Sequence, residues 1–299
     1  MTEGLSIYLP PFAADYAGVC SVLFDYDCLI IIDDAGCCTR GYLACDEPRS
    51  NKRALSSRLR AIEAVMGDEE RLISQSVEAI DELKPKFAAV VGSPVTSLIG
   101  RDMSAVAARI EDRAGIPVLG FDTTGFRYYN HGASAAYLKL FERFGSPNSK
   151  ALGATLLDGY LQKPHCEDWT LMSLSGFAAA ERFCKYTMPA PQCLFEITPD
   201  TLIVGDQVVA NAIRGGADAV VASFFGIEPK LAQEGDILLK SEKSLVTLLS
   251  GGRFRRLIAD PLICAMPQAA KLSCDHLPHP AISGELFSSQ DTKINKGDS

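Results

Sequence analysis

The chain has 299 residues, of which 47 % are hydrophobic and 22 % charged, and its net charge is −8. This composition excludes a chain that is disordered over most of its length, the length predicts two domains, and the charge argues against a broad basic face for nucleic acid. The apolar runs are far shorter than the roughly 20 residues of a membrane-spanning helix. The first residues lack the basic and apolar stretches of a signal peptide, so we expect a cytoplasmic protein with neither a nucleic-acid nor a membrane partner.

The first half of the chain alternates short apolar strands with helices. We predict strands over residues 28–33, 87–91 and 118–121. Helices are predicted over 51–65, from Asp68 to Pro85, over 102–114 and over 132–144. Strands separated by helices of about ten to fifteen residues predict a parallel sheet with right-handed crossovers.

The second half repeats this pattern after an interruption. Residues 145–149 read as a linker, and prolines break up residues 150–199, where a strand over 151–157 is predicted. Further strands are predicted over 201–204, 219–222 and 256–259, with helices over 208–214 and 244–249. The predicted fold is α/β, with two Rossmann-like parallel-sheet domains, or two and a half, facing a central cleft. Its parts are an N-terminal domain 1–148 with cysteine loops, a reduced middle segment 149–199, a C-terminal domain 200–287 and a disordered tail 288–299.

Common nucleotide and hydrolase motifs are missing from the sequence. It has no Walker A motif, no Gly-x-Gly-x-x-Gly after a strand, no His-Glu-x-x-His and no Gly-x-Ser-x-Gly. We therefore do not expect the chain to hydrolyse ATP or bind a dinucleotide by the usual route, or to be an α/β-hydrolase.

Ten cysteines are many for a cytoplasmic chain, in which disulfides are poorly maintained. A free cysteine can serve simply as a small buried hydrophobe, and that role suffices for the five cysteines beyond residue 160. The other five favour metal binding, because several lie beside glycine in predicted loops: Cys20, Cys28, Cys37, Cys38 and Cys45. Glycine lets the backbone approach a bulky group, so that amides can donate hydrogen bonds to sulfur.

Several short segments follow one another in an order and spacing that resemble the nitrogenase component 1 type oxidoreductases. This family includes molybdenum–iron protein subunits, their cofactor-assembly scaffolds and the catalytic subunits of dark-operative protochlorophyllide reductase. The segments are Tyr16-Ala-Gly-Val-Cys20, Ala35-Gly-Cys37, Met66 to Leu72, Lys84 to Val91, Leu98 to Asp102, Gly115 to Val118, Thr124 to Phe126, Ala259 to Pro261 and Leu277 to Gly284. The first two are similar to the family's cluster-cysteine loops.

The resemblance implies an iron–sulfur cluster. The position of the family's third cluster cysteine is Pro94 here, beside Ser93, which favours a 4Fe-4S cluster over a larger one. Such a cluster needs four thiolates, and Cys20 and Cys37 from each of two subunits would supply them. Cys38 is the first alternate ligand, followed by Cys28 and Cys45. The partner is then a second copy or a paralogous subunit, and a separate ATP-dependent iron protein would reduce the cluster.

Four residues are candidates to line the cleft. They are Arg101 and Asp102, which follow the Leu-Ile-Gly segment, and His279 and Ser283 near the end of the chain. Arg101 could pair with an anion or lie on the solvated surface. His279 could line the cleft or form hydrogen bonds with the backbone of a turn.

Three functions remain open at this point. The first is a nitrogenase-like reductase subunit that passes electrons through the cluster. The second is a non-catalytic scaffold that holds a metallocluster or a tetrapyrrole during assembly. The third is a small-molecule binding protein that kept the fold and lost the cluster.

Overall fold

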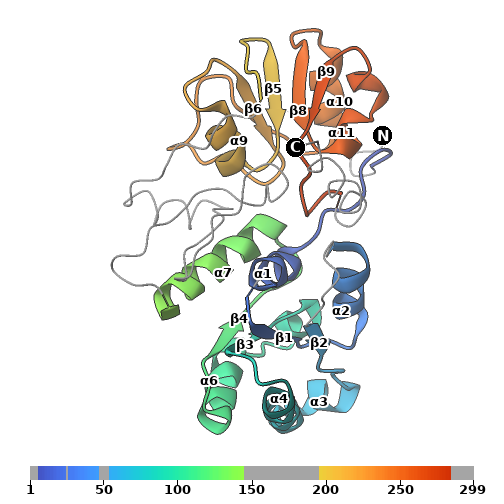
Figure 1. Cartoon of the computed structure of the whole chain (residues 1–299). Coiled ribbons are helices and arrows are strands. Elements are labelled where there is room, and N and C mark those ends of the chain that lie inside the picture. Colours follow the sequence, from blue (N-terminus) through green and yellow to red (C-terminus); the bar gives the residue numbers. More distant parts are fainter. Residues whose placement is uncertain (1–5, 25, 47–53, 145–194, 284–299) are drawn as a thin grey trace, which may run out of the picture. The chain divides into compact units, whose positions relative to one another are not determined.

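The computed structural model describes residues 6–24, 26–46, 54–144 and 195–283. The chain divides into two compact units, one formed by residues 13–139 and the other by residues 1–12 together with 140–299 (Figure 1). Nearly all of the predicted middle segment 149–199, its strand over 151–157, and the predicted tail 288–299 lie outside the described residues.

Unit 13–139 is built on a four-stranded parallel sheet, as the alternation of strands and helices predicts. Its strands lie in the order β2 (Ala54–Ser56), β1 (Cys28–Ile32), β3 (Phe87–Val91) and β4 (Val118–Phe121). Every residue of β1, β3 and β4 is buried. These strands are unbroken apolar runs because helices cover both faces of the sheet.

The helix predicted over residues 51–65 is wrong. Residues 54–56 form β2, which pairs with β1 from Ile30↔Ala54 to Ile32↔Ser56, and the helix α3 covers only Ala61–Met66. Helix propensity is a weak preference, and here pairing with a buried strand overrides it. Gly67, the predicted end of this helix, does terminate it in a left-handed conformation.

Helices lie on both faces of this sheet (Figure 1). Helices α4 (Glu70–Leu83) and α6 (Met103–Ala114) pack on one face, and their apolar side chains share a core with Leu29 and Ile31 of β1. Helices α1 (Asp15–Leu23) and α7 (Tyr129–Phe144) lie on the other face. The shorter helical segments are α2 (Cys37–Gly41), the π-helical turn η1 (Tyr42–Asp46) and α5 (Pro94–Leu98).

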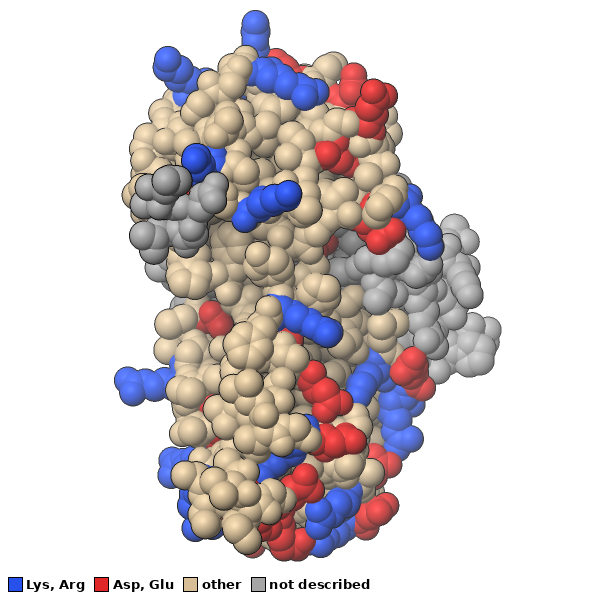
Figure 2. Space-filling model, turned by 180° about the vertical axis from the view of Figure 1, so that it is seen from behind, with Lys and Arg blue, Asp and Glu red and all other residues tan. Residues whose placement is uncertain are grey.

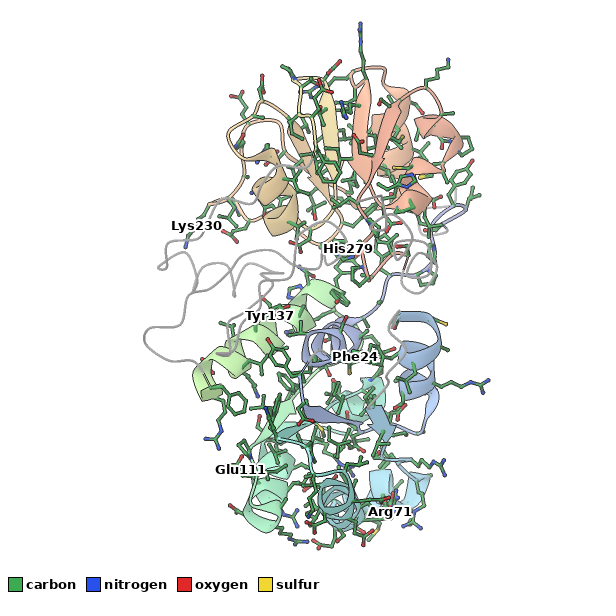
Figure 3. All side chains as sticks on the ribbon, viewed as in Figure 1. Phe24, Arg71, Glu111, Tyr137, Lys230 and His279 are labelled. Carbon is green, nitrogen blue, oxygen red and sulfur yellow. The ribbon has the colours of Figure 1, made fainter. Side chains whose placement is uncertain are left out.

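Helices α1 and α7 cross at two glycines, where their backbones almost touch. A Cβ atom at Gly132 would overlap the carbonyl oxygen of Asp15, and one at Gly18 would overlap the carbonyl oxygen of Tyr129. Tyr137 of α7 and Phe24, the residue after α1, mark these helices in Figure 3. Gly18 is thus required by close packing, whereas in the sequence it resembles a loop residue.

The other unit contains a five-stranded parallel sheet. Its order is β7 (Ile237–Leu238), β6 (Val220–Ser223), β5 (Thr201–Val204), β8 (Arg256–Ala259) and β9 (Ser273–His276). Its helical segments are α9 (Gln207–Arg214), α10 (Glu242–Ser250), α11 (Pro261–Cys264) and the 3₁₀ turn η2 (Pro267–Ala269). The predicted strands 201–204, 219–222 and 256–259 are confirmed to within a residue, whereas β7 and β9 were not predicted.

The first described residues of the chain are fastened to this second unit by one carboxylate. Glu242, at the start of α10, accepts hydrogen bonds from the backbone N–H groups of Ile7, Tyr8 and Leu9 at 2.8, 2.9 and 2.8 Å. These bonds hold the pKa of Glu242 below its usual value although burial acts in the opposite direction. The bonds explain why residues before Phe12 belong to this unit and not to the one that follows them in sequence.

The loop after β9 closes over the end of β8. Asp260 accepts hydrogen bonds from the N–H groups of Leu262 at 2.9 Å and of His279 at 2.8 Å. The ring of His279 stacks on Phe225 with 4.5 Å between the ring centroids, and its Nδ1 accepts a bond from the N–H of Ala281. Burial lowers the pKa of His279 to about 3, so this imidazole is neutral in the folded protein.

Positive and negative side chains are interspersed on the face of the molecule that Figure 2 shows. Arg109 and Arg113 of α6, for example, pair with Glu70 of α4. Among the described residues, no helix is both long enough and apolar enough to cross a lipid bilayer.

We predict that Gly132→Ala destabilises the protein by at least about 2 kcal/mol, because the new methyl group forces α1 and α7 apart. Gly216→Ala is the matched control, since a Cβ there meets nothing within 4 Å, and we expect it to change stability by less than about 0.5 kcal/mol. The measurement is the urea midpoint followed by circular dichroism. Equal midpoints for the two variants would contradict the close crossing.

A second prediction concerns pH. Between pH 6.5, the usual pKa of histidine, and about pH 3, unfolded His279 binds a proton that the folded protein does not. Stability should therefore fall as the pH drops below 6.5, by up to about 1.4 kcal/mol per pH unit from this group. His279→Asn keeps an acceptor near the Nδ1 position and should flatten the dependence between pH 7.5 and 5. His276→Asn, at the exposed end of β9, is the control. An unchanged slope in His279→Asn would contradict the buried neutral imidazole.

Candidate metal site

The carboxyl ends of β1 and β3 form the topological switch point of the sheet in unit 13–139, where the strand order reverses. From β1 the chain goes to β2 on one side and then to β3 on the other. In parallel α/β sheets, ligands bind at the carboxyl ends of two neighbouring strands whose following loops run to opposite sides. The loop after β1 carries Asp33, Asp34 and Cys37, and the loop after β3 carries Ser93, whose hydroxyl donates a 2.7 Å hydrogen bond to the carbonyl of Asp33.

Asp33 is completely buried and is neutralised by an arginine from a distant segment. Its carboxylate pairs with the guanidinium of Arg101 at 2.7 Å and accepts a hydrogen bond from the Ser57 hydroxyl at 2.6 Å. The Arg101 side chain is only 3 % exposed. The guanidinium of this cleft candidate therefore neutralises a carboxylate of the protein itself. Its neighbour Asp102 caps α6 by accepting a bond from the N–H of Ala105 at 2.9 Å.

Asp34 fixes the start of the helix that carries the cysteine pair. Its Oδ2 accepts a 2.9 Å bond from the N–H of Thr39. Its Oδ1 accepts bonds from the hydroxyls of Thr39 and Ser56 at 2.9 and 2.6 Å. Gly36, which precedes the helix, has φ = 104°, a conformation that other residues rarely adopt. The turn and the carboxylate together set the direction in which α2 leaves the sheet.

Cys37 and Cys38 are the first two residues of α2, and their sulfurs lie 3.9 Å apart. Cys37 is exposed and Cys38 is half-buried. One carboxylate oxygen of Asp34 and the two sulfurs all lie within 4.8 Å of one another. Burial and the neighbouring Cys37 raise the pKa of Cys38 to about 12, so its thiol is protonated at neutral pH unless a cation displaces the proton.

Helix α1 brings Tyr16 and Cys20 to the same place. The two residues are four apart in α1 and therefore share one helical face. Burial raises the pKa of Tyr16, and so do the charges of Cys38, Asp46, Cys20 and Cys37, in that order. The Tyr16 hydroxyl hydrogen bonds to the Cys38 side chain and favours its thiolate. Tyr16 thus lies among three of the five N-terminal cysteines.

One local expectation from the sequence differs from the structure. Cys20 was expected in a glycine loop, but it lies in α1 and is completely buried. Neither Tyr16 nor Asp34 was singled out as part of the site. The spacing of Tyr16 and Cys20 could have indicated Tyr16, but only if residues 15–23 had been interpreted as a helix.

The remaining candidate residues lie in other surroundings. Cys28 is buried within β1, where burial raises the pKa of its thiol. Cys45 is exposed in η1. His279 and Ser283 belong to the other unit, where both bond to the Asp260 side chain, His279 through its backbone N–H.

Comparison with known proteins finds a similar family over part of the chain and a similar fold. Residues 27–165 match the model of the family described as nitrogenase component 1 type oxidoreductase. No curated protein matches the chain. A solved structure titled "Nitrogenase Cp1 at pH 6.5" is similar with a TM-score of 0.62 and 10 % sequence identity, covering 100 % of this chain and 96 % of that one.

A second structure, titled "Nitrogenase Cp1 at pH 5", has a TM-score of 0.60 and 13 % identity, covering 98 % of this chain and 89 % of that one. At these identities the structural likeness establishes the fold alone, and the family rests on the match of residues 27–165. The resemblance noted in the sequence is thereby confirmed. Residues 27–165, slightly less than half of the chain, are similar to the nitrogenase component 1 type oxidoreductase family.

Proposed function

We propose that this chain is a subunit of a nitrogenase-like oxidoreductase and carries a 4Fe-4S cluster at a subunit interface. The observation that supports this is the gathering of Cys20, Cys37 and Cys38 around Tyr16, at the carboxyl ends of β1 and β3. Cys37 and Cys38 lie inside the segment that matches the family. Thiolates are the ligands that iron–sulfur clusters use.

The number of sulfurs argues for a second subunit. Thiolates on different irons of a cubane point away from its centre, so they are farther apart than two thiolates on one metal. Since Cys37 and Cys38 are 3.9 Å apart, only one of them would bind cluster iron. Cys20 and Cys37 then supply two ligands, with Cys38 as the first alternate and Cys28 and Cys45 as further ones. A second copy or a paralogous chain supplies the rest.

The residues around these thiols hold them in place and tune them. Asp34 and Gly36 direct α2, and the Tyr16 hydroxyl hydrogen bonds to the sulfur of Cys38. Hydrogen bonds to sulfur and burial are two means by which a protein sets the potential of a cluster. When bound, the cluster would pass electrons from a separate ATP-dependent iron protein to a substrate.

Along the sequence, we further propose a domain of residues 1–148, a reduced middle segment 149–199 and a domain of residues 200–287, although residues 1–12 are grouped with the C-terminal unit. We place the chain in the cytoplasm. The seven cysteines within the described ranges form no disulfide bonds.

The ligands can be tested by anaerobic reconstitution with iron and sulfide. We predict that Cys20→Ser and Cys37→Ser each remove most of the bound iron, the acid-labile sulfide and the visible sulfur-to-iron absorption. Cys264→Ser is the matched control, because Cys264 lies in the other unit, where its Sγ contacts the carbonyl of Ala259 at 3.5 Å. Full iron in the double variant Cys20→Ser, Cys37→Ser would contradict the assignment.

The interface can be tested through the mass of the particle. We predict that the reconstituted wild-type chain, or its complex with a paralogous chain, has the mass of a dimer by light scattering. Cys37→Ser should lower the dimer fraction together with the iron content. A monomer that holds a complete four-iron cluster would contradict the interface. Turnover with an ATP-dependent iron protein would then separate a reductase from an assembly scaffold, which would hold the cluster without turning over.

A further inference from the structure

The side chains of Asp34, Cys37 and Cys38 already have the spacing that a single metal ion requires. The ligand atoms, one from each residue, lie within 4.8 Å of one another. Two thiolates that bind one tetrahedral zinc ion at about 2.3 Å are roughly 3.8 Å apart. The sulfurs of Cys37 and Cys38 are 3.9 Å apart. The pair could close on one ion with almost no movement.

Asp34 is oriented as a ligating carboxylate must be. A carboxylate has about four lone-pair sites. Three of them accept bonds here, two on Oδ1 from Thr39 and Ser56 and one on Oδ2 from the N–H of Thr39. Among the described residues, one lone-pair site on Oδ2 accepts no hydrogen bond. In metal sites, hydrogen bonds of this kind hold the metal-binding side chains in place and increase the affinity for the metal.

We propose that Asp34, Cys37 and Cys38 of one chain bind a single borderline-soft divalent cation of the zinc class. Two thiolates out of three ligands select such an ion over magnesium or calcium, which prefer oxygen. Cys37 is exposed, so a fourth position is open to water or to a partner's ligand. This site goes beyond the proposed cluster, because it requires neither Cys20 nor a second subunit.

Cobalt(II) tests the site, since its tetrahedral thiolate complexes are coloured and zinc displaces it. We expect one cobalt per full-length chain when the metal-free, reduced protein is titrated, with a sulfur-to-cobalt charge-transfer band that zinc abolishes. Cys37→Ser and Cys38→Ser should each lose this band. Thr39→Ala keeps the backbone bond to Asp34 but removes the hydroxyl donor, and should weaken binding by roughly 10–100-fold. Circular dichroism shows whether each variant is folded.

The controls separate this site from other thiols. Cys20→Ser should bind cobalt like the wild type although it loses cluster iron. The double variant Cys264→Ser, Cys274→Ser tests the other neighbouring thiol pair and should also bind normally. Retention of the band by folded Cys37→Ser, Cys38→Ser, or its loss in the Cys264, Cys274 variant, would overturn the proposal. A wild-type chain that assembles a cluster but binds no cobalt refutes this site alone. One that binds cobalt but assembles no cluster refutes the cluster alone.

Discussion

Two buried carboxylates at the end of β1 determine how the N-terminal unit is organised around its thiols. Asp33 and Asp34 are both completely buried, and a buried charge is tolerated only when it is paired and hydrogen-bonded. Asp33 therefore requires Arg101, which comes from the segment before α6. Asp34 requires Thr39 and Ser56, which come from α2 and β2. Pairing the charge of Asp33 and hydrogen-bonding that of Asp34 thus joins three segments at the end of a single strand.

These buried carboxylates are better explained by the positions they impose on neighbouring segments than by a contribution to the stability of the fold. A buried ion pair gains little over well-packed apolar side chains, because removing the charges from water is costly. The Asp33–Arg101 pair does, however, fix one position of the segment before α6. The bonds of Asp34 likewise fix the first turn of α2, where Cys37 and Cys38 lie. The close crossing of α1 and α7 at Gly18 and Gly132 likewise restricts the position of α1, the helix that carries Tyr16 and Cys20.

The parts of the fold that the sequence predicts well are those where local pattern and burial agree. Strands β1 and β3 are continuous apolar runs because both of their faces are covered. Strand β9 has the sequence Ser-Cys-Asp-His and lies at the edge of its sheet, so no alternation or apolar run marks it. Strand β2 has only three residues and exists because β1 pairs with it. Helix α1 was missed because Gly18 indicates a loop unless the packing of α7 is known.

The candidate site shows the same limit. Gly36 beside Cys37 and Cys38 is a local pattern that can be recognised in the sequence, and Gly36 does precede the helix that carries both cysteines. The pair formed by Arg101 and Asp33 joins residues 68 positions apart, and no local pattern reveals it. The same holds for Tyr16, whose approach to Cys38 depends on the relative positions of α1 and α2.

The proposed cluster and the proposed single-cation site share one ligand, Cys37, and differ in the spacing of the thiolates that they require. A cubane needs thiolates that are well separated, and these come from different elements, such as α1 and α2. A single cation needs thiolates about as far apart as Cys37 and Cys38. Cys37 is a proposed ligand in both cases, with Cys20 for the cluster and with Cys38 for the single cation. Since one thiolate of Cys37 cannot fully serve both sites at once, a bound cation and an interface cluster would compete for the same subunit. Whichever metal reaches the thiols first would then influence whether a subunit can join a cluster-bridged dimer.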